Sequence, residues 1–126
     1  MINLFYITNN ITEAQIVDDL DIDWIFIDLE TIGKKERQVG RNTVLSNHSM
    51  DDIHNIKSKI NKTKILVRCN PIGEWSKNEF DEINARGSEI DMVMLPYFKT
   101  SEEVKIFINL LDTCKIEPAL LIETLD

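Results

Sequence analysis

The sequence predicts an α/β fold with a parallel sheet of about five strands and four helices. Two observations predict it. Short apolar runs such as residues 24–27 and 119–122 show no polar alternation, which is typical of strands buried on both faces of a parallel sheet. Segments with helical spacing separate the later runs at intervals of about thirty residues, as expected for successive βαβ units. With 126 residues the chain has the size of one domain, so we predict a single domain over residues 1–126.

The predicted elements follow one another without a linker. Strands are expected at 2–8, 24–27, 64–67, 91–96 and 119–124, and a long polar loop follows the second strand. Three helices are expected to open with a capping box, in which Ser or Thr precedes Glu or Gln by three residues. The boxes begin at Thr12, Ser76 and Thr100, and the remaining helix is expected to start near Ser49. Helical spacing assigns buried faces to Ala14, Val17 and Leu20 in the first helix and to Val104, Phe107, Ile108 and Leu111 in the last.

The composition argues against polyanionic partners. Twenty-two acidic and fourteen basic residues give a net charge of −8, so we expect no general affinity for nucleic acid or for an anionic membrane surface. The apolar opening segment lacks a basic leader and is too short for a signal peptide or a membrane span. Cys69 and Cys114 fit neither a disulfide framework nor a four-ligand zinc site. We therefore expect a cytoplasmic protein with reduced thiols.

Charged side chains follow three of the predicted strands. Asp28 and Glu30 end the second strand, Arg68 ends the third and Glu123 ends the fifth. Because the carboxyl ends of parallel strands meet at one edge, where α/β folds place their chemistry, we expect these groups to converge. The Arg68 guanidinium is suited to gripping a carboxylate or phosphate at two points. The alternative is that Arg68 forms a structural ion pair with Asp28 or Glu30.

The loop after the second strand is basic in an otherwise acidic chain. Lys34, Lys35, Arg37 and Arg41 are four of the fourteen basic residues, and an anionic substrate would be drawn there, with Lys34 and Arg37 as candidate binding residues. A solvated charged loop is the alternative. His48, just before the second helix, is a candidate proton carrier, although a single loop histidine often has no role.

Several short motifs occur in a fixed order along the chain: Asp28-Leu29-Glu30, Gly33-Lys34, Glu36-Arg37-Gln38, Leu66-Val67-Arg68-Cys69-Asn70-Pro71, Val93-Met94-Leu95-Pro96, Lys99-Thr100, Glu102-Glu103-Val104 and Leu121-Ile122-Glu123-Thr124. Together they resemble the HpcH/HpaI aldolase and citrate lyase family. The resemblance implies the phosphoenolpyruvate/pyruvate type of (β/α)8 barrel, of which residues 1–126 would be the amino-terminal part. It also implies a carbon–carbon lyase acting on a 2-oxo acid or acyl-coenzyme A.

The resemblance assigns roles to individual residues. Glu123 corresponds to the family's metal-binding glutamate, with Mg²⁺ as the expected ion and Mn²⁺ as the alternative. Arg68 corresponds to the arginine that holds the substrate carboxylate beside the enolate oxygen, and Glu30 to the acid at the end of the second strand. A cation and a guanidinium aimed at a developing enolate would supply its electrostatic stabilisation.

The chain departs from the family in two respects. Thr31 stands where the aldolases carry a proton-transferring histidine, which favours the citrate-lyase-like branch or another base such as His48. A full barrel needs about 250 residues, and the chain ends before the segment that would bring the second metal ligand. We therefore expect this chain alone to be inactive and either to self-associate or to need a complementing barrel half. The alternatives are an open flavodoxin-like sheet for the fold, and a non-catalytic half-barrel remnant or interaction protein for the function.

Overall fold

A computed structural model describes residues 2–31 and 48–122 of the chain. Over these residues strands and helices alternate, which confirms the predicted α/β class. The elements are β1 (Phe5–Ile7), α1 (Ile11–Asp19), β2 (Trp24–Asp28), α3 (Met50–Lys57), β3 (Lys64–Arg68), α4 (Ser76–Ala85), β4 (Met92–Leu95), α5 (Ser101–Leu110) and β5 (Glu117–Leu120).

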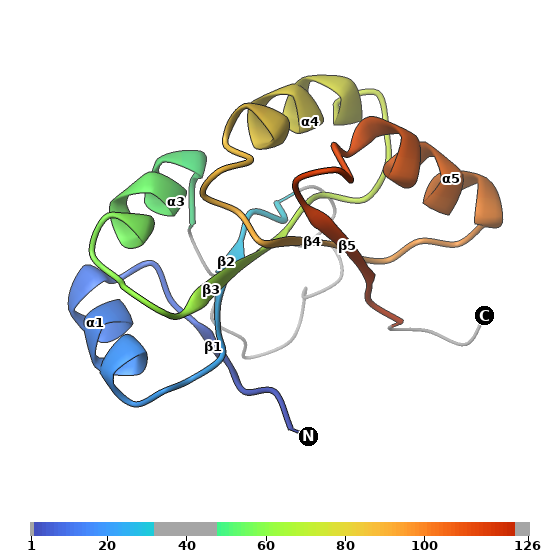
Figure 1. The fold of residues 1–126 in the computed structure, drawn as a ribbon. Coiled ribbons are helices and arrows are strands. Elements are labelled where there is room, and N and C mark those ends of the chain that lie inside the picture. Colours follow the sequence, from blue (N-terminus) through green and yellow to red (C-terminus); the bar gives the residue numbers. More distant parts are fainter. Residues whose placement is uncertain (1, 32–47, 123–126) are drawn as a thin grey trace, which may run out of the picture.

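The five strands form one parallel sheet whose spatial order is the order of the sequence, β1-β2-β3-β4-β5. The helices form an arc along one side of this sheet (Figure 1). A flavodoxin-like sheet has the order 2-1-3-4-5 with helices on both faces. The observed winding, always onward in one direction, is that of a partial (β/α) barrel.

The two faces of the sheet have different surroundings. Ile25, Ile65, Val67 and Val93 lie on the face below the helices and are fully buried in the main core. The opposite face carries a smaller apolar cluster around Trp24, Phe26 and Leu66. Because β2 and β3 are buried on both faces, their sequences are continuous apolar runs instead of alternating ones.

The start of α1 differs from the prediction. The N-cap is Asn10, not Thr12, and its side chain accepts the backbone N–H of Glu13 at 2.9 Å. Thr8 reinforces this arrangement, because its hydroxyl accepts the Asn10 N–H and donates to the Glu13 carboxylate. The helix therefore begins earlier, and Leu20 becomes an exposed C-cap outside the buried face.

The start of α4 also differs, whereas those of α3 and α5 are confirmed. Trp75 is the N-cap of α4, and the Ser76 hydroxyl accepts the Gly73 N–H. Glu79, predicted to complete a capping box, turns instead toward Asn70, which offers it two donors. Ser49 and Thr100 cap α3 and α5 in capping boxes closed by Asp52 and Glu103, although Ile108 of α5 is exposed.

Strand β5 is shorter and less buried than predicted. It spans Glu117–Leu120, so it starts two residues before the predicted 119 and ends before Glu123. It pairs only with β4 among the described strands, which makes it an edge strand, and Glu117, Pro118 and Leu120 are exposed, so it is not buried on both faces. Pro118 lies within it, in register with Val93. The N–H groups of Glu117 and Leu121 point toward β4, so the Pro118 nitrogen faces the outer side, where its missing N–H costs no bond to β4.

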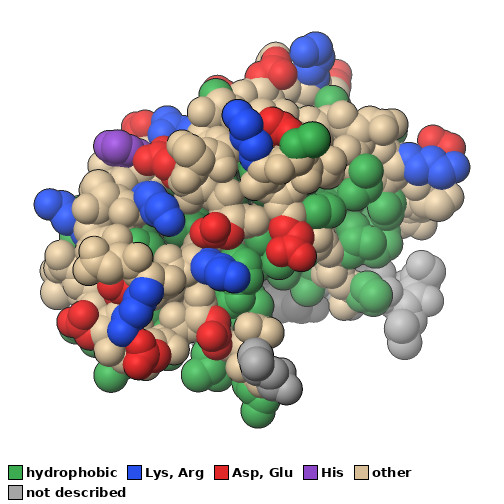
Figure 2. Space-filling model, in the orientation of Figure 1, with side chains coloured by type: hydrophobic (Ala, Val, Ile, Leu, Met, Phe, Trp, Pro, Cys, Tyr) green, Lys and Arg blue, Asp and Glu red, His purple; other side chains and the backbone are tan. Residues whose placement is uncertain are grey.

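Both ends of the sheet expose apolar side chains (Figure 2). Ile7 of β1 is 53% exposed, and Leu120 of β5 is 45% exposed. Each of these strands has one neighbour among the described strands. The structure contains no helix, within the described residues, that is long and apolar enough to cross a membrane.

Candidate functional site at the carboxyl edge of the sheet

Asp28 and Arg68 form a two-point ion pair where β2 and β3 end. The two residues are partners in the parallel register. The Arg68 Nε donates to Asp28 Oδ1 at 3.0 Å and the terminal nitrogen donates to Oδ2 at 2.6 Å. Asp28 is 2% exposed and the Arg68 side chain 17% exposed. The pair is thus the structural ion pair considered above, placed where a barrel fold carries its chemistry.

Glu30 also lies close to the Arg68 guanidinium. Its Oε1 is 3.9 Å from the Arg68 Nε, and its side chain is almost completely buried. The backbone N–H of Glu30 donates to Asp28 Oδ1 at 3.1 Å, which bends the chain around the aspartate. The guanidinium also lies 5.3 Å from the centre of the Phe26 ring. Two carboxylates and one aromatic face therefore orient Arg68.

His48 joins this group through the backbone. Its Nδ1 accepts the N–H of Asp28 at 2.8 Å, at a point on β2 that lies beyond the end of β1. Because Nδ1 accepts this bond, the proton of the neutral ring is on Nε2. The three described candidates for catalysis, Arg68, Glu30 and His48, thus lie around Asp28. Their catalytic roles stay predictions.

Asn70 and Glu79 complete the edge, and neither was predicted as a site residue. The Asn70 backbone N–H donates to Glu79 Oε1 at 3.0 Å and its side-chain amide donates to Oε2. Its Oδ1 accepts the backbone N–H of Thr31 at 2.7 Å. Burial raises the pKa of Glu79 although both bonds from Asn70 act to lower it. Asn70 could have been predicted as a site residue, because it is a polar residue just after the end of β3. Glu79 could not, because its spacing from Ser76 indicated a capping box instead.

Three predicted site residues lie outside the described residues: Glu123, Lys34 and Arg37. Within residues 2–31 and 48–122, no group of three or more His, Cys, Asp or Glu side chains could hold a metal ion. Of the carboxylates at this edge, Asp28 and Glu30 face the Arg68 guanidinium, and Glu79 accepts two hydrogen bonds from Asn70. The described residues alone therefore do not make a metal site.

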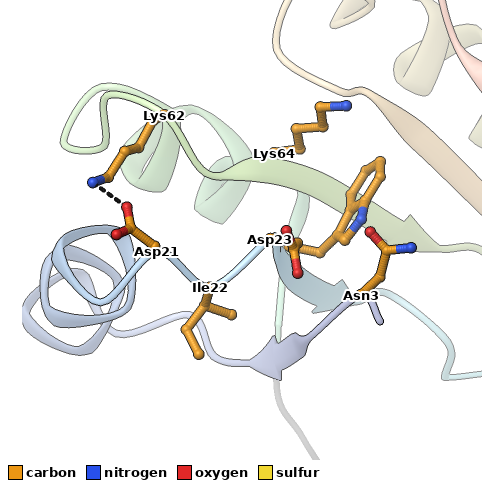
Figure 3. Close-up of a pocket in the computed structure, with 7 residues that line it drawn as sticks. Asn3, Asp21, Ile22, Asp23, Lys62 and Lys64 are labelled. Atoms are coloured by element: carbon orange, nitrogen blue, oxygen red, sulfur yellow. Dashed lines mark ion pairs between the residues drawn. The ribbon is translucent and has the colours of Figure 1, made fainter. Parts of the chain in front are cut away.

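A pocket of about 300 Å³ lies at the opposite, amino-terminal edge of the sheet (Figure 3). Its charged groups are engaged in local contacts: Lys62 pairs with Asp21, Asp23 accepts the Leu4 N–H, and Lys64 lies 5.3 Å from the centre of the Trp24 ring. The pocket is formed by residues around the starts of β2 and β3. We do not assign it to the chemistry, because α/β folds bind substrates at the carboxyl edge.

Comparison with known proteins assigns no family to the chain. No protein-family model matches it, and no curated protein matches it.

Proposed function

We propose that the chain is the amino-terminal part of a carbon–carbon lyase or aldolase-type barrel that acts on a 2-oxo acid or an acyl-coenzyme A. The observation that carries this proposal is the position of Arg68. Its guanidinium is 17% exposed, lies at the carboxyl edge of β3 and is held by Asp28 and Glu30. A largely buried, oriented guanidinium at this edge suits the recognition of a small carboxylate.

In this proposal Arg68 binds the carboxylate of the substrate and remains beside the oxygen that gains negative charge. Asp28 sets the plane of the guanidinium, because its two oxygens accept two parallel N–H bonds. Glu30 contributes a second buried carboxylate beside the guanidinium. His48 is the candidate base; its Nδ1 accepts the Asp28 N–H, so that bond would have to be released before this nitrogen could take up a proton. Lys34 and Arg37 would attract the anionic substrate.

The proposed cofactor is a divalent cation, Mg²⁺ or alternatively Mn²⁺, with Glu123 as the ligand this chain supplies. Such a cation would stabilise negative charge on the substrate. Since Asp28 and Glu30 lie against Arg68 and Glu79 accepts two hydrogen bonds from Asn70, Glu123 would hold the ion without help from these carboxylates, and therefore weakly. We therefore propose that this chain alone does not turn over pyruvate, oxaloacetate or acyl-coenzyme A substrates.

The proposed partner is a second copy or a complementing half-barrel in the cytosol. The exposed apolar side chains of β1 and β5 support it, because unpaired strand edges favour pairing with another chain.

A second candidate function is a non-catalytic half-barrel that serves as an interaction module. The observation that favours it is that Asp28 already engages the Arg68 fork at two points. A buried carboxylate needs such a partner for stability whether or not a substrate binds. In this case the guanidinium would not exchange contacts with an added anion.

Binding of oxalate, a two-carboxylate mimic of an enolised 2-oxo acid, distinguishes the lyase from the non-catalytic interaction module. We expect isothermal titration of the full chain with oxalate to show binding that Arg68→Lys weakens by roughly tenfold or more, since an ammonium cannot form the fork. The matched control is Arg86→Lys, at a partly exposed arginine paired with Asp51 and Glu89. Glu123→Gln should weaken Mg²⁺ binding. Equal oxalate affinity in Arg68→Lys would contradict the lyase proposal.

A further inference from the structure

We infer that Glu79 of α4 is a positioning residue that fixes the end of β2 relative to β3 through Asn70. The inference rests on the proposed function in taking the edge with Arg68 and Glu30 as the reacting edge. The contacts described above do not join Glu79 to Arg68 or to Glu30. Glu79 acts through Asn70, which lies two residues after Arg68. Asn70 in turn accepts the backbone N–H of Thr31, the residue that follows Glu30.

The bond from Thr31 to Asn70 continues the pairing of the two strands. At the end of the ladder, the Leu29 N–H donates to the Arg68 carbonyl oxygen at 3.0 Å. Two residues further along the chain, the Thr31 N–H donates to the Asn70 side chain at 2.7 Å. The orientation of the Asn70 amide therefore controls where Thr31 lies. Because Glu30 is the preceding residue, this bond also constrains the approach of Glu30 to Arg68.

The direction of each hydrogen bond determines which group fits at position 79. Asn70 presents two donors, its backbone N–H and its side-chain NH₂, and both oxygens of Glu79 accept them. A glutamine has one oxygen and one NH₂, so one of its groups would face a donor. Flipping the Asn70 amide would move the conflict to the Thr31 N–H. Only a group with two acceptors satisfies the whole relay from Glu79 to Asn70 to Thr31.

Burial of the Glu79 carboxylate has an electrostatic cost. Burial raises the pKa of Glu79, so the protein keeps a carboxylate where its ionised form is disfavoured by desolvation. An apolar side chain facing an apolar neighbour would avoid that cost. The two hydrogen bonds from Asn70 oppose that cost, because both act to lower the pKa of Glu79.

The backbone amide of Thr31 reports directly on the relay. In ¹⁵N NMR spectra of the full chain, we expect Glu79→Gln to shift the Thr31 amide and to speed its hydrogen exchange about tenfold, the effect of losing one hydrogen bond. Asp81→Asn is the matched control, because Asp81 is an exposed acid on the same helix paired with Lys77. An unchanged Thr31 amide in Glu79→Gln would overturn the relay.

Exchanging the amide and the carboxylate between positions 70 and 79 should restore the hydrogen bonds of the relay. In the double variant Asn70→Asp with Glu79→Gln, the amide NH₂ of the introduced glutamine would donate to one oxygen of the introduced aspartate, and Thr31 would donate to the other. The backbone N–H of residue 70 would still donate to the glutamine oxygen, and the net charge would be unchanged. We expect the Thr31 amide shift and exchange rate to return toward the wild-type values. Failure of the double variant to recover them, while it remains folded by circular dichroism, would contradict the proposed bond directions.

Oxalate titration tests whether the relay positions the reacting edge. We expect Glu79→Gln to weaken oxalate binding about tenfold, as loss of outer-shell support does in other sites, whereas Asp81→Asn should leave it unchanged. If Glu79→Gln disturbs the Thr31 amide but not the oxalate affinity, the positioning role is wrong. If the wild-type chain binds no oxalate, the proposed function fails, and the relay is judged on the Thr31 amide and its rescue.

Discussion

Asp28 and Arg68 are partners in the register of two neighbouring parallel strands, and their side chains join at two points on one face of the sheet. The pair ties together the ends of β2 and β3, with Glu30 beside it. We expect Arg68→Ala to lower the free energy of unfolding by roughly 3 to 5 kcal/mol, because it leaves a carboxylate buried without its cation. Urea unfolding monitored by circular dichroism measures this.

A double-mutant cycle tests the same pair against general packing loss. Asp28→Ala together with Arg68→Ala should cost less than the sum of the two single variants, since neither charge is then left without the other. Strictly additive costs would mean that the two side chains do not interact in solution.

The second prediction concerns Asp18, a buried aspartate of α1. It accepts the backbone N–H groups of Asn61, Lys62 and Thr63 and the Thr63 hydroxyl, at 2.8 to 3.0 Å. Burial acts to raise the pKa of Asp18, but these four hydrogen bonds outweigh it and hold the pKa well below the ordinary value. Asp18 therefore stabilises the fold above the pKa of the unfolded chain, and this contribution is lost as the pH falls.

At pH 7 we expect Asp18→Asn to lower the free energy of unfolding by roughly 2 to 3 kcal/mol. The difference from wild type should shrink as the pH is lowered from about 5 toward about 2. Asp19→Asn, a change at the exposed neighbour in the same helix, is the control. A difference that stays constant with pH would refute the role assigned to the Asp18 carboxylate.

The basic loop leads to a third prediction, which concerns binding. Replacing Lys34, Lys35, Arg37 and Arg41 together with glutamine removes four of the fourteen basic residues. We expect weaker binding of oxalate at low salt and a smaller difference from wild type at high salt, because added ions screen the attraction. Thermal unfolding should change little. Unaltered oxalate affinity at low salt would assign the loop no part in binding.

The fourth prediction concerns the sheet ends. We expect the full chain to self-associate, and Ile7→Lys with Leu120→Lys to shift it toward a monomer, because charges on edge strands oppose pairing. Both side chains are about half exposed, so the fold should tolerate the change. Size-exclusion chromatography with light scattering gives the mass. Ile108→Lys, at an exposed residue of α5, is the control, and an equal shift in that variant would contradict a specific role of the strand edges.

The fold was largely predictable because its signals are local and repeated. The apolar runs of β2 and β3 and the capping box of α5 each depend on a few adjacent residues. The predicted starts of α1 and α4 were wrong where a competing partner took over the capping group. Asn10 preceded Thr12 as a cap, and Glu79 bonded to Asn70 from a neighbouring segment of the chain.

The sequence predicted where the candidate site lies, but not which of its side chains contact one another. Arg68 and the acids of β2 converge because strand ends share an edge. Sequence spacing gave no information about which carboxylate Arg68 would grip, or that His48 would accept the Asp28 N–H. Such contacts depend on loop paths and side-chain rotamers that no local pattern encodes.

Pro118 limits the hydrogen bonding of any strand that would pair with β5 on the side away from β4. Along this strand the N–H groups of alternate residues face outward, and at Pro118 that donor is missing. The carbonyl group of Pro118 and both backbone groups of Leu120 are then the outward bonding groups within the strand. In every alignment of an incoming parallel strand that reaches this point, the carbonyl oxygen opposite the Pro118 nitrogen would have no donor from β5. The proline thus removes one hydrogen bond from any strand that pairs with β5 on this side, which disfavours indiscriminate stacking of copies.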